Sequence, residues 1–327
     1  MIISRTPVRV SFCGGGTDLD WFANSEQTGG RVTSVALNRH IYVTVNARFD
    51  DKVRISYSKT ELVDNFEELE HELIRESMRI TGVTSGVEIT TIADIPSRGT
   101  GLGSSSTVTV GVLNALHNFV GRKVSAHQLA EEACRIEIDI LSQPIGRQDQ
   151  YAAAYGGVNS ISFGSNGVVV EPLDLGDEVL ERLESEFTLI FTGMSRRASS
   201  VLSESPEDEA DRLARLRAIR AQADVAQAHL ESGDLAGLGA LLEGAWQAKR
   251  GITASVSNEE LDALHDRILA LGASGAKLLG AGGGGFFLAH GDAGLRSQLT
   301  AELGDSHRII PLAIDFDGST IIHTGSE

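Results

Sequence analysis

Pro96-Ser97-Arg98-Gly99-Thr100-Gly101-Leu102-Gly103-Ser104-Ser105-Ser106 is a loop rich in glycine and serine that runs into an apolar segment, residues 107–120. The three glycines let another group approach the main chain closely, and the serines follow where a helix should begin. A helix start presents N–H groups without intrahelical partners and the positive end of the helix dipole, which together favour an anion. The stretch therefore predicts a loop that holds the phosphates of a nucleotide. A serine-capped helix after a flexible turn is the alternative.

The composition limits the class of protein. The chain has 327 residues, with 41% hydrophobic and 22% charged, enough for a substantial core in one large or two intertwined domains. The net charge of −17 argues against nucleic acid or an anionic membrane as partner, but a local cationic cluster or a metal ion still permits a phosphorylated ligand. Cys13 and Cys134 are expected to be buried free thiols. Without a signal peptide or a run of about 18 apolar residues, we expect a cytoplasmic protein.

Strand and helix patterns are mixed along the chain without strict βαβ alternation. Period-two alternation predicts strands at residues 2–12, 31–57, 87–92, 158–163, 167–172, 188–192 and near 308–323. Helical spacing predicts helices at residues 60–81, 105–120, 126–141, 207–249 with a break at Gly233, 258–271 and 292–303. A glycine-punctuated segment covers residues 142–158. The pattern favours an α+β fold with two domains that share one cleft.

Two further glycine motifs stand at strand ends. Gly14-Gly15-Gly16-Thr17-Asp18 closes the first strand, where Asp18 can accept hydrogen bonds from two sugar hydroxyls; a glycine hairpin followed by an N-cap aspartate is the alternative. Gly280-Ala281-Gly282-Gly283-Gly284-Gly285 precedes a strand, so it is neither a Walker nor a Rossmann loop. Four consecutive glycines there indicate a close approach by another group, with a floppy loop as the alternative.

The three motifs, in this order, resemble those of the GHMP small-molecule kinases, over nearly the whole chain. Within that superfamily, residues 14–18, 146–157 and 191–196 look most like the D-glycero-D-manno-heptose 7-phosphate kinases. The resemblance implies an ATP-binding N-terminal domain at residues 1–180 and a C-terminal domain at residues 181–327, with the active site in the cleft between them. It also implies ATP and Mg²⁺ as cofactors.

The resemblance assigns the metal site. In the family, the second serine of Gly-Leu-Gly-Ser-Ser and a helix glutamate bind Mg²⁺, and Ser105 and Glu137 match them. One hydroxyl and one carboxylate suit this ion, which prefers oxygen ligands and retains waters. Other acids share the helix with Glu137, so only the motif match selects it, and a solvated residue on an amphipathic helix is the alternative.

Asp149 matches the superfamily aspartate that faces the accepting hydroxyl, and the resemblance makes it the general base. An N-cap aspartate is the alternative. Arg9 matches a lysine or arginine that polarises this hydroxyl or stabilises the transferred phosphoryl group. A strand arginine paired with a surface carboxylate is its ordinary explanation.

The acceptor side is assigned in the same way. The residues expected to contact the acceptor are Gly15, Gly16, Thr17, Asp18, Gly282, Gly283, Arg196 and Lys249. Arg196, and Lys249 in the Trp-x-x-Lys match, are the cations for a phosphate already on the acceptor, since such cations suit phosphate capture. The helix dipole explains Lys249 and Arg250 equally well. The sequence leaves the roles of Arg147, Arg197 and Arg250 open.

Three functions follow from these patterns. The first is an ATP-dependent kinase that converts heptose 7-phosphate to the 1,7-bisphosphate. The second keeps the fold and phosphorylates an unphosphorylated sugar, such as fucose or another hexose. The third is a catalytically silent regulator that binds sugar and nucleotide, which the presence of Asp149, Ser105 and Glu137 disfavours. The partner is a small-molecule sugar phosphate, and the chain is expected to be a monomer or homodimer.

Overall fold

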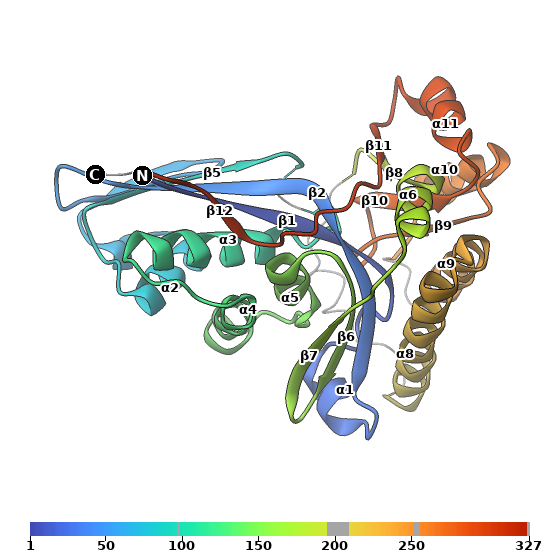
Figure 1. Ribbon diagram of the computed structural model, residues 1–327, viewed down its shortest axis with the longest axis horizontal. Helices are drawn as coiled ribbons and strands as arrows, with labels where there is room; N and C mark the ends of the chain where they lie inside the picture. The colour runs from blue at the N-terminus through green and yellow to red at the C-terminus, as the bar shows by residue number, and fades with distance from the viewer. Residues whose placement is uncertain (97–98, 195–208, 251–255, 326–327) are drawn as a thin grey trace.

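A computed structural model describes residues 1–96, 99–194, 209–250 and 256–325, which form two β-sheets with helices packed against them (Figure 1). The larger sheet has the strand order β12-β1-β2-β5-β3-β4, and β2 also pairs with β6, which pairs with β7. Its strands are β1 (Ile2–Cys13), β2 (Gly30–Ala47), β3 (Val53–Ser56), β4 (Thr60–Val63), β5 (Val87–Ala93), β6 (Val158–Gly164), β7 (Gly167–Pro172) and β12 (Thr320–Thr324). The long strand β2 joins the two branches of the sheet, because its first half pairs with β6 and its second half pairs with β5.

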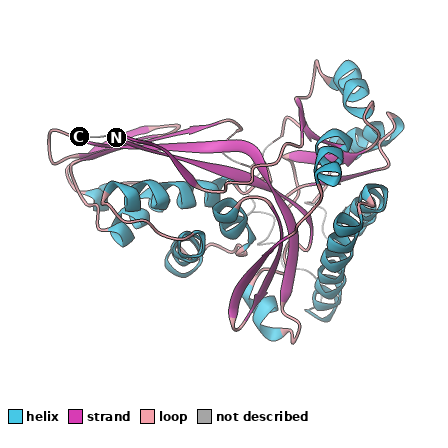
Figure 2. Cartoon of the chain, in the orientation of Figure 1, coloured by secondary structure: helices cyan, strands magenta, loops and turns pink. Residues whose placement is uncertain are grey.

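One face of the larger sheet is covered by helices from the N-terminal half (Figure 2). They are α2 (Glu72–Thr81), α3 (Ser104–Phe119), α4 (Ala126–Cys134), the π-helical turn η2 (Arg135–Ile140) and α5 (Gln148–Tyr155). The short helices α1 (Asp20–Ser25) and η1 (Phe66–Glu68) lie in connections. Val32 of β2, Val110 of α3 and Tyr151 of α5 belong to one buried cluster between sheet and helices. Burial of this apolar area holds the start of α3 beside α5.

The smaller sheet is antiparallel and has the order β11-β8-β10-β9. Its strands are β8 (Phe187–Phe191), β9 (Gly275–Leu278), β10 (Phe286–His290) and β11 (Ile309–Pro311). The accompanying helices are α6 (Asp177–Glu186), α8 (Glu209–Ser232), α9 (Leu235–Arg250), α10 (Glu259–Ala270) and α11 (Leu295–Leu303). Within the described ranges, no helix is long and apolar enough to cross a bilayer.

The two sheets share one apolar core. Val10 and Phe12 of β1 lie in a buried cluster with Leu189 of β8 and Leu242 of α9. The rings of Phe12 and Phe187 meet edge to face, with centroids 5.9 Å apart. This contact fixes the strand that carries Arg9 against the C-terminal half. Residues 320–324, near the end of the chain, return to the larger sheet and pair with β1 (Figure 1). The last strand thus lies with the N-terminal half. The domain boundary between residues 180 and 181 therefore stays a prediction.

The α+β class predicted from the sequence is confirmed, and most strands and helices fall where the periodicity places them. Residues 60–81 are wrong as one helix, because they form β4, η1 and then α2. The side chain of Asn65 accepts a hydrogen bond from the N–H of Glu67, which caps η1, and the side chain of His71 caps α2. The helix expected at residues 126–141 changes to a π-helical turn after Cys134. Helix α5, inside the glycine-punctuated segment, and α6 were missed.

Candidate active site

Asp149 lies against the glycine-serine loop. It is in the first turn of α5, and its carboxylate is 23% exposed. A Cβ atom placed on Gly103, the residue before α3, would lie 3.0 Å from Oδ2 of Asp149. Arg9 of β1 donates from Nε to Oδ1 of Asp149 over 2.7 Å and from Nη1 to the carbonyl oxygen of Gly101 over 2.7 Å. Strand, loop and helix therefore meet at one carboxylate, and Arg9 does not pair with a surface acid.

The third glycine motif packs against the loop from Gly99 to Ser106. A Cβ on Gly101 would lie 2.6 Å from the carbonyl oxygen of Leu279, and one on Gly280 would lie 2.5 Å from Cα of Gly101. Only glycine permits these main chains to approach so closely. Leu102 is buried, and its carbonyl oxygen accepts from the N–H of Arg9 over 3.1 Å. The N–H groups of the first turn of α3, from Ser104 onward, have no intrahelical acceptors and can face an anion.

Gly282 and Gly283 contact a different segment. The N–H of Gly283 donates to the carbonyl oxygen of Val256 over 2.9 Å, and a Cβ on Gly282 would lie 3.0 Å from Cα of Val256. The contact with the phosphate loop is made by Gly280 and by Gly285, which abuts Thr100. The sequence analysis expects Gly282 and Gly283 to contact the acceptor, and that role stays a prediction.

Glu137 is completely buried and belongs to the π-helical turn η2. Its carboxylate accepts hydrogen bonds over 2.6 Å each from Ser106, Thr109 and Gln150. It is therefore not a solvated residue, and a π turn is a frequent feature of functional sites. Burial, with a smaller contribution from Asp149, raises the pKa of Glu137 to about 7 despite the three donors.

These residues fit a magnesium ion. Ser105 is the exposed member of the three serines, whereas Ser104 and Ser106 are buried. Among the described residues, no cation forms an ion pair with Glu137, so its negative charge has no counter-charge at short range. An exposed hydroxyl and an uncompensated carboxylate supply the oxygen donors that Mg²⁺ prefers. In the structure Glu137 bonds Ser106, and Ser105 is left free for a ligand.

The first glycine motif is built around Asp18, which is buried at 2% exposure. Oδ1 of Asp18 accepts from the N–H of Gly16 over 2.8 Å and from Nε2 of Gln148 over 3.1 Å, while Oδ2 accepts from the N–H of Gln148 over 3.0 Å. A side chain at Gly146 would overlap this carboxylate. Asp18 is thus not an N-cap, and it fixes Gln148, the residue before Asp149.

The other residues of the first glycine motif differ in their exposure to solvent. Thr17 is fully buried, and its hydroxyl bonds the main chain of Gly14 and Arg31. Gly15 and Gly16 are not buried; Gly15 lies beside Gln148, and Gly16 lies beside Leu216 of α8. Gln148 was not among the site residues predicted from the sequence, although it stands next to Asp149 in the segment of residues 146–157.

Cations from both halves gather at the same place. Nζ of Lys249, on the last turn of α9, donates to the carbonyl oxygen of Gly280. Lys277 of β9, 9% exposed, donates to the carbonyl oxygens of Ser11 over 3.2 Å and Phe12 over 2.6 Å. Burial lowers the pKa of Lys249 to about 7, with contributions from Lys277 and then Arg9. Lys277 was missed because a single lysine before a glycine motif gives no signal.

Two arginines left open by the sequence have ordinary partners. Arg147 pairs with Asp20 over 2.7 Å, and Arg250 pairs with Asp262 over 2.9 Å. Arg196 and Arg197 lie outside the described residues.

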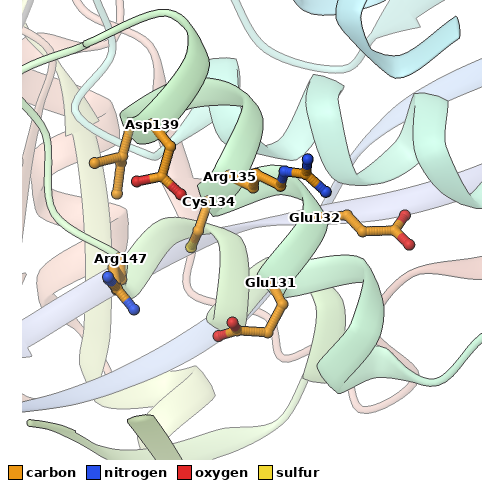
Figure 3. Close-up of a pocket in the computed structure, with 7 residues that line it drawn as sticks. Glu131, Glu132, Cys134, Arg135, Asp139 and Arg147 are labelled. Atoms are coloured by element: carbon orange, nitrogen blue, oxygen red, sulfur yellow. The ribbon is translucent and has the colours of Figure 1, made fainter. Parts of the chain in front are cut away.

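Two hollows have Arg147 or Leu19 in their lining, and neither is lined by Asp149, Arg9 or Lys249. One, of about 320 Å³, is lined by acids and arginines around Cys134, including Glu131, Asp139 and Arg147 (Figure 3). The second, of about 420 Å³, begins at Leu19, next to Asp18, and includes Trp21 and Arg212. The guanidinium of Arg212 stands 4.1 Å from the centroid of the Trp21 ring. The second hollow therefore borders the first glycine motif.

A glycine-serine loop before a helix, a carboxylate beside it and cations from both halves of the chain are the arrangement expected of a phosphotransferase of small molecules. The family models agree with this class: GHMP kinases N terminal domain matches residues 63–157, and GHMP kinases C terminal matches residues 226–305. The chain belongs to the GHMP kinases, and it is a kinase of the sugar-kinase type.

Two of the curated relatives carry the names of sugar kinases. D-glycero-alpha-D-manno-heptose 7-phosphate kinase from Campylobacter jejuni is 30% identical over 87% of this chain and 88% of its own length. L-fucokinase/L-fucose-1-P guanylyltransferase from Bacteroides fragilis is 25% identical over 88% of this chain and 34% of its own length. The crystal structure of a D-glycero-D-manno-heptose 1-phosphate kinase from Bacteroides thetaiotaomicron has a TM-score of 0.82 with 24% identity, covering 100% of both chains. That last likeness supports the fold.

Proposed function

We propose that the chain is an ATP-dependent sugar 1-kinase that converts D-glycero-D-manno-heptose 7-phosphate to the 1,7-bisphosphate. One observation carries the proposal: the carboxylate of Asp149 abuts Gly103, where the phosphate loop becomes helix α3. A base in this position stands between the nucleotide and an acceptor. The similarity to the Campylobacter jejuni heptose 7-phosphate kinase supports this acceptor.

Asp149 is the general base of the reaction. The anomeric oxygen attacks the γ-phosphorus of ATP and gives its proton to Asp149, while the bond from the γ-phosphorus to the bridging oxygen breaks and ADP leaves. Main-chain N–H groups of residues 99–106 hold the nucleotide phosphates. Arg9 bonds both Asp149 and Gly101, so it holds the base beside the loop and stabilises negative charge on the phosphoryl group.

Ser105 and Glu137 would hold Mg²⁺. When bound, the ion neutralises charge on the nucleotide phosphates. Thr109 and Gln150 orient Glu137 for this purpose through the hydrogen bonds at its two oxygens.

The acceptor lies at the first glycine motif. Gly15 and Gly16 give it access, Asp18 and Thr17 hold the motif in shape, and the hollow at Trp21 and Arg212 receives the far end of the sugar. Arg196, in the C-terminal domain of residues 181–327, is the cation for the acceptor's own phosphate, and Gly282 and Gly283 close the cleft opposite the ATP-binding domain of residues 1–180.

A coupled assay of ADP release tests the proposal with heptose 7-phosphate, mannose 6-phosphate, fucose, galactose and mevalonate as acceptors. We expect the highest kcat/KM on heptose 7-phosphate and loss of turnover when Mg²⁺ is chelated. Faster turnover of fucose would establish the second function, an unphosphorylated sugar kinase, which the 25% identity to the fucokinase from Bacteroides fragilis favours. Nucleotide binding without turnover of any acceptor would indicate the regulator.

A further inference from the structure

Arg9, Lys249 and Lys277 lie near one another at the junction of the two halves, and one of the three is paired with a carboxylate. Arg9 is paired with Asp149, whereas among the described residues neither Lys249 nor Lys277 has an acid within ion-pair distance. The two lysines and Arg9 are close enough for their charges to oppose one another, and the pKa of Lys277 is also lowered by burial. Like charges held together out of water are unfavourable unless an anion joins them.

The ammonium of Lys249 lies close to the phosphate loop. It donates to the carbonyl oxygen of Gly280, and Gly280 is in contact with Gly101. Arg9 donates a hydrogen bond to the carbonyl oxygen of Gly101. Lys249 from the C-terminal half and Arg9 from the N-terminal half thus reach the same pair of glycines.

Packing around Trp246 fixes the direction of Lys249. Trp246 is fully buried and meets Phe287 of β10 edge to face, with ring centroids 5.7 Å apart. Residues three apart share a face of an α-helix, so the burial of Trp246 turns Lys249 toward the sheet and the third glycine motif. Lys249 itself is only partly buried, so a ligand can reach it.

We propose that Lys249 contacts the transferring phosphoryl group of ATP from the side opposite Asp149, rather than the phosphate that the acceptor already carries. The inference rests on the proposed kinase reaction and deepens it. The negative charge of the bound triphosphate favours the protonated form of Lys249. As the bond between the γ-phosphorus and the bridging oxygen breaks and the bond to the acceptor oxygen forms, the ammonium balances charge on the phosphoryl oxygens. Lys277 joins β9 to β1 by donating to the carbonyl oxygens of Ser11 and Phe12, two and three residues after Arg9.

The test compares Lys249→Met with Arg250→Met. Arg250 is the adjacent cation on α9 and is paired with Asp262, so its substitution removes the same charge one residue away. The first measurement is the affinity of each variant for a non-hydrolysable ATP analogue and for ADP, both with Mg²⁺. We expect Lys249→Met to reduce the preference for the triphosphate about tenfold and Arg250→Met to leave it unchanged.

The second measurement is kcat and KM for heptose 7-phosphate and for the same heptose without its phosphate. We expect Lys249→Met to lower kcat by a similar factor, at least tenfold, on both acceptors. An unchanged triphosphate preference, with a higher KM confined to the phosphorylated acceptor, would overturn the inference and assign Lys249 to the acceptor's phosphate.

The nucleotide measurement needs no acceptor, so it decides the role of Lys249 even if none of the sugars is turned over. Failure of the proposed function and failure of this inference are therefore distinguishable. Lys249→Gln replaces Lys249→Met if the methionine variant does not fold, and a thermal melt of each variant establishes that it does.

Discussion

Arg9 and Asp149 form an ion pair in which Nε and Nη2 of Arg9 lie 2.7 Å and 2.6 Å from the same oxygen, Oδ1, of Asp149. Both donors converge on one carboxylate oxygen, which leaves Oδ2 facing Gly103 and the phosphate loop. The pair therefore leaves one oxygen of the carboxylate that we propose as the base without a bond to Arg9.

Substitution of this base separates binding from chemistry. Asp149→Asn keeps the size of the side chain and an oxygen acceptor, but it removes the ability to take a proton. We expect kcat to fall roughly 1000-fold, within the range for loss of a general base, while the affinity for ATP changes little. Steady-state kinetics and nucleotide titration measure the two effects, and turnover at the wild-type rate would reject Asp149 as the base.

Ionisation of the buried Glu137 carboxyl lowers the stability of the folded protein. A pKa raised from 4.5 to about 7 means that the folded state resists ionisation of this group. The penalty is absent below about pH 4.5, grows as the pH rises to about 7 and is complete above it, on the order of 3 kcal/mol. We expect Glu137→Gln to raise the Tm of the metal-free protein at pH 8 more than at pH 5.

The same variant should lose the increase in Tm that Mg²⁺ and an ATP analogue give the wild type, because the carboxylate ligand is gone. Asp139→Asn is the matched control, since Asp139 is exposed on the same turn two residues away. Melting curves at both pH values, with and without ligand, test the assignment. A Mg²⁺-dependent shift that survives in Glu137→Gln would argue against it as a metal ligand.

The sequence was informative where local chemistry decides structure. The loop at residues 99–106, its helix and the glycines at residues 14–16 and 280–285 are recognisable because glycine and serine have backbone roles that neighbours do not override. The sequence could not place Glu137 in a buried π-helical turn, since burial depends on Ser106, Thr109 and Gln150 from other segments. Lys277 was invisible for the same reason, because its partners are main-chain carbonyl oxygens more than 260 residues away.

Contact between the loop at residues 99–106 and the chain at Leu279 and Gly280 can be tested with two glycines of equal backbone conformation. Gly101 and Gly121 have φ of 75° and 76°, but a Cβ on Gly121 would meet nothing within 4 Å, whereas one on Gly101 would strike Leu279. Both alanine variants carry the strain of a left-handed residue, about 1–2 kcal/mol. We expect only Gly101→Ala to raise the KM for ATP, by at least tenfold. An equal effect of both substitutions would show that strain, not contact, matters.

The stability of the ligand-free protein should depend on Lys249 in a pH-dependent way. Its pKa is lowered from 10.5 to about 7 by burial, by Lys277 on β9 and by Arg9 on β1, so its charge costs free energy in the folded state. The cost is complete below about pH 7, declines as the pH rises toward 10.5 and then vanishes. Lys249→Met should therefore raise the Tm at pH 6, with a smaller rise at pH 9, while Arg250→Met gives no such pattern because Asp262 neutralises Arg250 at both pH values. Scanning calorimetry of the two variants measures this difference. A lower Tm for Lys249→Met at pH 6 would mean that the ammonium stabilises the empty site, and the reason for expecting an anion beside it would be lost.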